Sequence, residues 1–275
     1  MIRTALIAAV SLTLATVLGI APAGAQTGKV QVQWLGQAAT KITTPGGKVI
    51  VIDPWLKTNP KTPAEFKDLD ALGKVDLVLV THGHFDHSAD AAELAKKNKV
   101  LLYSPAGLNQ SLVKLGEIPA ELAPGMNKSG TVTPLGPNIK ITMTHAEHSS
   151  EYVWKNPATG KDEVHVGGEP VGYIIELENG FKIYHMGDTG LFGDMKLIGE
   201  HYKPDLILIP IGGNFTMDPQ HAAVATRDFL KPKYAMPFHY GTYPILKGTP
   251  EEYIKALGTT TTKVFPIKPG EKLEF

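Results

Sequence analysis

The sequence predicts a layered α/β fold, and three observations support this prediction. Residues 75–80 form a short β-branched and leucine-rich block that indicates a buried strand, and residues 88–97 directly after its loop indicate a helix. Further along the chain, apolar strands repeatedly end in Asp, His or Gly-Asp. At 275 residues with 43% hydrophobic content, the chain can bury a full core as one large domain or two small ones. If the strands form sheets packed face to face with helices outside, their ends can converge on one rim.

The composition excludes some classes of function. The 27 basic and 27 acidic residues give a formal net charge of zero, which argues against a general nucleic-acid binder because such proteins rely on a basic surface. A small-molecule substrate remains compatible with this balance, and so does a homo-oligomer. The chain has no cysteine, which excludes disulfides, lipoprotein attachment and thiolate metal ligands.

Residues 1–25 are predicted to be a signal peptide. Arg3 supplies a positive start, residues 5–20 form an apolar run, and Ala23-Gly24-Ala25 resembles a cleavage site before Gln26. A retained membrane anchor is the alternative, but the run is short of the about 20 apolar residues that span a bilayer. We therefore expect residues 26–275 to form an exported domain without stable membrane insertion, in a bacterial periplasm.

The first half of the mature chain alternates short strands with helices. Alternating or continuous apolar runs predict five strands, at residues 30–35, 41–44, 48–53, 75–80 and 100–103. Residues 54–72 are rich in proline, lysine and polar residues, and we expect a long surface loop whose role stays open. Helices are expected at 88–97, with an acidic first turn and a basic last turn, and at 108–115.

The second half continues this pattern. Strands are expected at residues 138–144, 171–177, 181–185, 205–211, 233–238 and 264–267. The polar, glycine-containing segment 151–169 indicates a hairpin or flap, again with an open role, and Asn179-Gly180 predicts a tight turn. Asp218 as N-cap with Pro219 at the first position begins a helix to about Leu230, and 250–257 is a short helix.

The most informative segment runs from Thr81 to His87 and places three imidazoles and a carboxylate within six residues. Packing is a poor explanation, because each buried imidazole would need its own hydrogen-bond partners. As metal ligands, the same side chains need only a cation. The segment follows a strand and precedes a helix, which is where layered α/β folds build their sites.

The spacing within this segment divides the ligands between two ions. His82 and His84 lie two residues apart on a strand-like exit, so both rings can point to one side. A third histidine from another strand would complete a three-imidazole site with one position open for water. Asp86 and His87 face away and can hold a second ion. Asp188, between two glycines, fits the carboxylate that would bridge the two ions.

Together these motifs resemble the metallo-β-lactamase-fold superfamily of metal-dependent hydrolases. The motif His82-x-His84-x-Asp86-His87 is followed in order by His148, Gly187-Asp188-Thr189 and His239. Further segments resemble a branch of uncharacterised hydrolases related to the L-ascorbate-6-phosphate lactonase group: Trp34-Leu35-Gly36, Asp53-Pro54, His148-Ser149-Ser150, residues 210–217 and His239-Tyr240-Gly241-Thr242.

The resemblance implies a four-layer αββα sandwich with a dinuclear centre, usually of zinc and sometimes of manganese or iron. Carried over by position, it implies that His82, His84 and His148 bind the first metal ion. Asp86, His87 and His239 would bind the second ion, and Asp188 would bind both.

Several other residues are weighed against simpler roles. His145 competes with His148 as the third ligand, and His148 is favoured by its His-Ser-Ser context. Asp53 could orient a ligand histidine or could cap its own turn before Pro54. Trp55, Trp154 and Tyr240 could line a substrate pocket or could be ordinary hydrophobic plugs, and His185 is expected to pack beside the site.

The expected activity is hydrolysis of an ester, lactone or phosphodiester bond by a hydroxide that bridges two divalent metal ions. Asp86 and Asp188 are the candidate catalytic carboxylates, with Asp86 taking part in proton transfer to the leaving group. Two other readings stay open. One is a metal-binding or sensing protein without turnover, and the other is a di-iron redox protein on the same fold.

Overall fold

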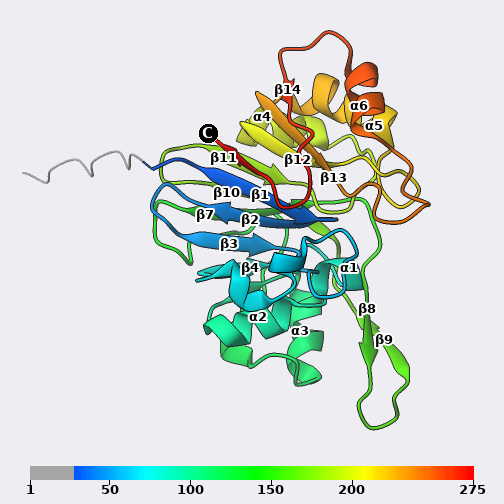
Figure 1. Cartoon of the computed structure of the whole chain (residues 1–275). Helices are drawn as coiled ribbons and strands as arrows, with labels where there is room; N and C mark the ends of the chain where they lie inside the picture. Colours follow the sequence, from blue (N-terminus) through cyan, green and yellow to red (C-terminus); the bar gives the residue numbers. More distant parts are fainter. Residues whose placement is uncertain (1–27) are drawn as a thin grey trace, which may run out of the picture.

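Two β-sheets packed face to face form the centre of the molecule, and helices cover both outer faces (Figure 1). The computed structural model describes residues 28–275, so the predicted signal peptide at 1–25 lies outside the described residues. The observed layers confirm the predicted αββα sandwich.

The first sheet has six strands in the order β15-β1-β2-β3-β4-β5. Their bounds are β1 Gln31–Gly36, β2 Ala39–Thr43, β3 Val49–Ile52, β4 Leu77–Leu79, β5 Leu102–Tyr103 and β15 Lys272–Glu274. Pairing is antiparallel from β15 to β3 and parallel from β3 to β5. The edge strand β15 was not predicted, and the last predicted strand lies at 264–267.

The second sheet has seven strands in the order β14-β13-β12-β11-β10-β7-β6. Their bounds are β6 Thr131–Val132, β7 Lys140–His145, β10 Val171–Glu176, β11 Lys182–His185, β12 Leu206–Pro210, β13 Tyr234–Phe238 and β14 Lys263–Val264. The strands from β11 to β14 run parallel, so the chain leaves β11, β12 and β13 at the same edge of the sheet. This edge carries part of the candidate site.

The helices divide between the two outer faces. Their bounds are α1 Phe85–Ser88, α2 Ala91–Asn98, α3 Ala106–Lys114, α4 Met195–Tyr202, α5 Pro219–Val224, the π-helix η4 Ala225–Leu230 and α6 Pro250–Leu257. Three short 3-10 helices are η1 Ala64–Phe66, η2 Leu69–Leu72 and η3 Ala120–Leu122. Helix α4 was not predicted. Within residues 28–275, no helix has the length and apolar character needed to cross a membrane.

Strand β4 shows why its sequence is continuously apolar. Leu77 and Leu79 pack into the core between the sheets, whereas Val78 packs into the layer formed by helices α2 and α3. Successive side chains of a strand point to opposite faces, and both faces of this sheet are covered. Strand β12 repeats the arrangement, with Leu206 and Leu208 facing the inter-sheet core and Ile207 facing helices α4 to α6.

The segment 54–72 differs from its prediction as a surface loop. Trp55, Leu56, Leu69 and Leu72 are all buried, and the chain forms η1 and η2 within the segment. Its leucines pack into the same apolar layer as α2 and α3. Lys57, Pro60 and Lys61 are exposed, but the apolar residues of the segment anchor it to the body.

The segment 151–169 forms a hairpin, as predicted. Strands β8 (Glu151–Lys155) and β9 (Asp162–Val166) pair antiparallel and project from the sandwich beside α3 (Figure 1). The side chains of Tyr152 and Trp154 are half-buried, whereas Val153 between them is exposed. One face of the hairpin therefore packs on the body, and the other remains open.

Tyr173 joins the two sheets next to the candidate site. Its hydroxyl, fully buried on β10, donates to the carbonyl of Val80 at 2.8 Å, at the point where the chain leaves β4. One residue further along, the backbone N–H of Val171 donates to the carbonyl of Thr81 at 3.0 Å. These bonds hold the start of the histidine-rich loop against the second sheet.

Replacing Tyr173 with Phe should lower the free energy of unfolding by about 1–3 kcal/mol, because the buried Val80 carbonyl loses its side-chain partner. Urea denaturation followed by circular dichroism measures this change. The matched control Tyr202→Phe, at a half-buried tyrosine on α4, should change stability by less than about 0.5 kcal/mol. Equal effects of the two substitutions would contradict the role given to the Tyr173 hydroxyl.

Candidate metal centre

The predicted ligands gather where four strands end. The segment from His82 to His87 follows β4, whereas His148, Asp188 and His239 follow β7, β11 and β13. The first sheet thus supplies the histidine-rich loop, and the second sheet supplies the remaining candidates. The expected convergence of strand ends on one rim is what the structure shows.

Three histidines form the first ligand group. One ring nitrogen from each of His82, His84 and His148 lies within 4.8 Å of the others. Within this group, His82 Nε2 and His84 Nδ1 are 3.0 Å apart. His145 is not part of it, because its Nδ1 lies 3.1 Å from the ammonium of Lys128. The structure therefore places His148, the favoured alternative, beside His82 and His84.

Asp86, His87, Asp188 and His239 form the second ligand group. Asp188 is its centre, with Oδ2 at 3.0 Å from His239 Nε2 and Oδ1 at 3.3 Å from His87 Nε2. Asp86 Oδ2 lies 3.5 Å from His239 Nε2. Asp188 Oδ2 also approaches His148 Nε2 of the first group at 3.7 Å. Asp188 thus lies between the groups, where a bridging carboxylate would be needed.

A buried network behind the ligands fixes two of the imidazoles. The Asp53 carboxylate accepts from the Thr81 backbone N–H and from the Thr81 hydroxyl, both at 2.7 Å, and lies 2.8 Å from His87 Nδ1. Because the single hydroxyl proton of Thr81 goes to Asp53, its oxygen must accept from His82 Nδ1 at 3.0 Å. Both histidines therefore carry their proton on Nδ1 and present Nε2 to the site.

His84 is held the opposite way round. Its Nε2 lies 3.1 Å from a carboxylate oxygen of Glu151 at the start of β8, so its Nδ1 is the nitrogen that faces His82. Of the two roles considered for Asp53, the structure supports orientation of a ligand histidine, His87. Glu151 orients His84 in a similar way. This role was not predicted, because Glu151 lies 67 residues from His84 in the sequence.

Two buried atoms of the second group show that it fits a cation. His87 Nε2 and Asp188 Oδ1 are 3.3 Å apart, and neither has a hydrogen-bond partner of ordinary geometry among the described residues. Burial lowers the pKa of His87, but Asp188, Asp86 and Asp53 outweigh it and raise that pKa well above its usual value, so this position attracts positive charge, from a proton or from a metal ion. The oxygen and imidazole donors suit a divalent ion such as zinc.

The electrostatics of the two groups differ. Burial, aided by the neighbouring His87, lowers the pKa of His82 well below its usual value, and burial also lowers the pKa of His148. These imidazoles are therefore neutral, as metal ligands must be. In the second group, burial opposes protonation of His239, but Asp188 outweighs it and raises the pKa of His239 to about 9. The second group thus attracts positive charge.

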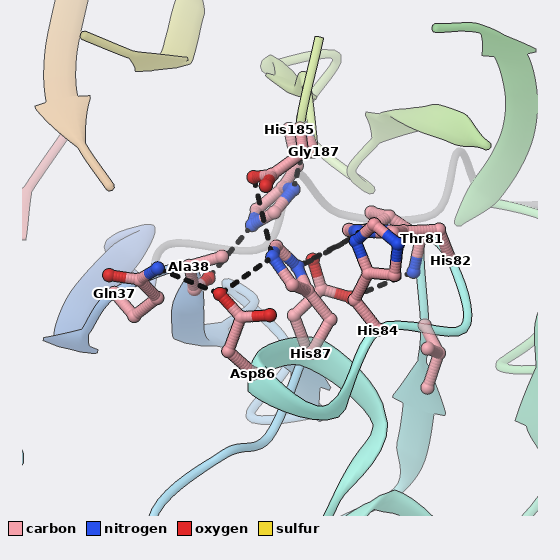
Figure 2. Close-up of polar contacts among 12 residues, drawn as sticks. Gln37, Ala38, Thr81, His82, His84, Asp86, His87, His185 and Gly187 are labelled. Carbon is pink, nitrogen blue, oxygen red and sulfur yellow. Dashed lines mark hydrogen bonds and ion pairs between the residues drawn. The ribbon is translucent and has the colours of Figure 1, made fainter. Parts of the chain in front are cut away.

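Gln37 is a site residue that the sequence analysis missed. It occupies the turn between β1 and β2 with a left-handed backbone, φ 51°, and its side chain is buried. Its Nε2 donates to Asp86 Oδ2 at 2.8 Å (Figure 2). The same Nε2 lies 2.7 Å from His239 Nε2. The sequence showed only a break between strands. A polar residue in a turn between two buried strands is the signal that could have identified it.

His185 supports this turn from the second sheet. Fully buried on β11, it lies with Nε2 3.1 Å from the carbonyl of Ala38, and its Nδ1 accepts from the backbone N–H of Gly187 (Figure 2). It thus packs beside the ligands, as expected, and connects the Gln37 turn with the loop that carries Asp188.

The ligand groups open into a pocket of about 330 Å³. Its aromatic walls are Phe85, Phe215 and Tyr243, and none of the three aromatic residues proposed from the sequence is among its lining residues. Trp55 is buried beneath Phe85 and Tyr243, Trp154 donates its indole N–H to Glu117, and Tyr240 packs on Trp34. Of the two roles left open for these three residues, the structure supports packing rather than pocket lining, because the sequence alone does not show which aromatic rings are buried.

Comparisons with known proteins agree with this geometry. Residues 48–240 match the family model of the beta-lactamase superfamily domain. A UPF0173 metal-dependent hydrolase of Polaromonas is 65% identical over 249 residues, covering 90% of this chain and 91% of the relative. Another from Cupriavidus necator is 65% identical over 257 residues, covering 92% and 89%. The solved structure of Igni18, a metallo hydrolase from Ignicoccus hospitalis, aligns with a TM-score of 0.76 and 34% identity, covering 90% of this chain and 98% of that one.

Replacing Asp53 with Asn should weaken zinc binding by about 10–100-fold, because the amide cannot accept all the protons that Thr81 and His87 direct at the carboxylate. Competition with a chromophoric chelator measures this affinity. The surface control Asp70→Asn on η2 should leave it unchanged. Wild-type zinc affinity in Asp53→Asn would show that the network does not position the ligands.

Proposed function

Because the chain belongs to the beta-lactamase superfamily, and within it to the UPF0173 metal-dependent hydrolases, we propose that it hydrolyses an ester, lactone or phosphodiester bond in a small molecule with two divalent metal ions. The observation that carries this proposal is the pair of ligand groups linked by Asp188.

In this proposal His82, His84 and His148 would hold one ion, Asp86, His87 and His239 would hold the other, and Asp188 would belong to both ligand sets. Imidazole and carboxylate donors without thiolates are those of catalytic rather than structural zinc sites. The nitrogen-rich donor set favours zinc, with manganese or iron as alternatives. When bound, such ions lower the pKa of water from about 15.7 to about 7 and polarise the substrate oxygen.

The protein's own groups would orient the substrate and move protons. Asp86 lines the pocket, so its carboxylate is placed to accept a proton and deliver it to the leaving group. Gln37 holds one oxygen of that carboxylate through its Nε2 and leaves the other free. Gln37 and Ser149 also line the pocket and offer hydrogen bonds to a polar reacting group.

Removal of a ligand tests the proposal directly. Wild-type protein should contain two equivalents of zinc by inductively coupled plasma mass spectrometry and should release p-nitrophenol from a model ester in a metal-dependent reaction. In His84→Ala and Asp188→Ala, the metal content should fall, and hydrolysis should slow by more than about 100-fold. Loss of a residue that only orients a ligand costs up to about that factor, and loss of the ligand itself should cost more.

The exposed histidine variant His221→Ala on α5 serves as control and should keep both metal and activity. A metal-free variant that stays fully active would contradict the proposal. Two equivalents of metal without turnover of any ester, lactone or phosphodiester would instead favour a metal-sensing protein.

A further inference from the structure

We propose that the pocket beside the metal centre binds an uncharged, apolar substituent of the substrate, so that the substrate is an ester or lactone with an alkyl or aryl group. This inference rests on the proposed hydrolase function and narrows it. It sets aside substrates whose non-reacting part is phosphorylated or otherwise anionic.

The pocket walls are apolar side chains from four separate segments. Phe85 comes from α1, Val153 from β8, Phe215 from the loop after β12, and Tyr243 and Leu246 from the loop after β13. Phe85 and Phe215 are each 57% exposed and Val153 is 52% exposed. Large exposed apolar side chains that gather around one pocket mark a binding surface.

One wall is a rigid cluster of rings. Trp55 is 2% exposed, and its indole N–H donates to the Thr58 hydroxyl at 2.7 Å. Phe85 meets it edge-on at 5.4 Å between ring centroids, and Tyr243 stacks on it at 6.1 Å. The buried Trp55 ring therefore holds the rings of Phe85 and Tyr243 in place. Because these rings are already ordered, binding an apolar group costs less conformational entropy.

Away from the metal ligands, the pocket offers no cation to an anionic substituent. Asp86 and Asp188 belong to the ligand groups, Glu151 is the other acidic lining residue, and among the described residues that line the pocket none is lysine or arginine. Recognition of a phosphate or carboxylate normally uses such a cation. Lys57, two residues after Trp55, is paired with Glu93 at 2.5 Å and does not line the pocket.

The apolar surface continues from the pocket onto the hairpin. Val153 pairs across the strands with Val164, so the two side chains share one face of the hairpin. Val164 is 70% exposed. An alkyl chain longer than the pocket itself therefore has further apolar surface to lie on.

Two lactones with the same five-membered ring test the inference. The zinc-loaded protein should hydrolyse γ-nonalactone with a kcat/KM at least about tenfold above that of γ-hydroxymethyl-γ-butyrolactone, because only the alkyl chain gains from the apolar walls. The double variant Phe85→Ala/Phe215→Ala should lose most of this preference. The exposed control Ile254→Ala on α6 should keep it.

A binding measurement separates this inference from the hydrolase proposal. The carbocyclic analogue 3-pentylcyclopentanone has no bond to hydrolyse, and calorimetry should show binding to wild type that is about tenfold weaker in the double variant. Binding of this kind without turnover of either lactone would support the apolar pocket and count against lactone hydrolysis. Equal or faster turnover of the hydroxymethyl lactone, or no binding of the ketone, would overturn the inference.

Discussion

The buried carboxylate of Asp53 is the constraint on which the candidate site depends. It lies at the end of β3, fully buried, and it is satisfied only because Thr81 and His87 surround it with donors. A buried charge without such partners would cost several kcal/mol. Its backbone is left-handed, φ 49°, which costs about 1 kcal/mol for a residue other than glycine. The hydrogen bonds of this carboxylate thus fix the arrangement of the histidine-rich loop. In this arrangement His82 and His87 turn their Nε2 atoms toward the metal site.

The parts of the site that the sequence predicted are those set by local spacing. His82 and His84 fall into one group and Asp86 and His87 into the other, as their alternation along the exit from β4 indicated. The glycine before Asp188 allows a close approach between the two sheets. Gly187 has φ 62°, and a Cβ there would lie 2.9 Å from the Cβ of Thr81, so only glycine lets this loop come so close to the chain that leaves β4 of the first sheet.

The parts that the sequence did not predict depend on contacts between distant segments. Gln37 lies 202 residues from His239, and nothing in its own neighbourhood shows that the two side chains meet. The aromatic residues of the pocket were not predicted for the same reason. Trp55 and Phe85 are both large aromatic residues beside strand ends, yet the fold buries one and exposes the other at the pocket. Strand β15 and helix α4 were missed because their pairing and packing partners lie elsewhere in the chain.

Each ligand group draws on both halves of the sandwich. His82 and His84 come from the first sheet and His148 from the second, and in the other group Asp188 and His239 face Asp86 and His87 in the same way. A cation bound there is therefore a cross-link between two layers as well as a cofactor. A ligand that binds only the folded state adds about 2.7 kcal/mol of stability at a concentration 100 times its dissociation constant. Metal supply would then govern how long the folded chain persists against proteolysis, so that starvation for the ion depletes the protein itself.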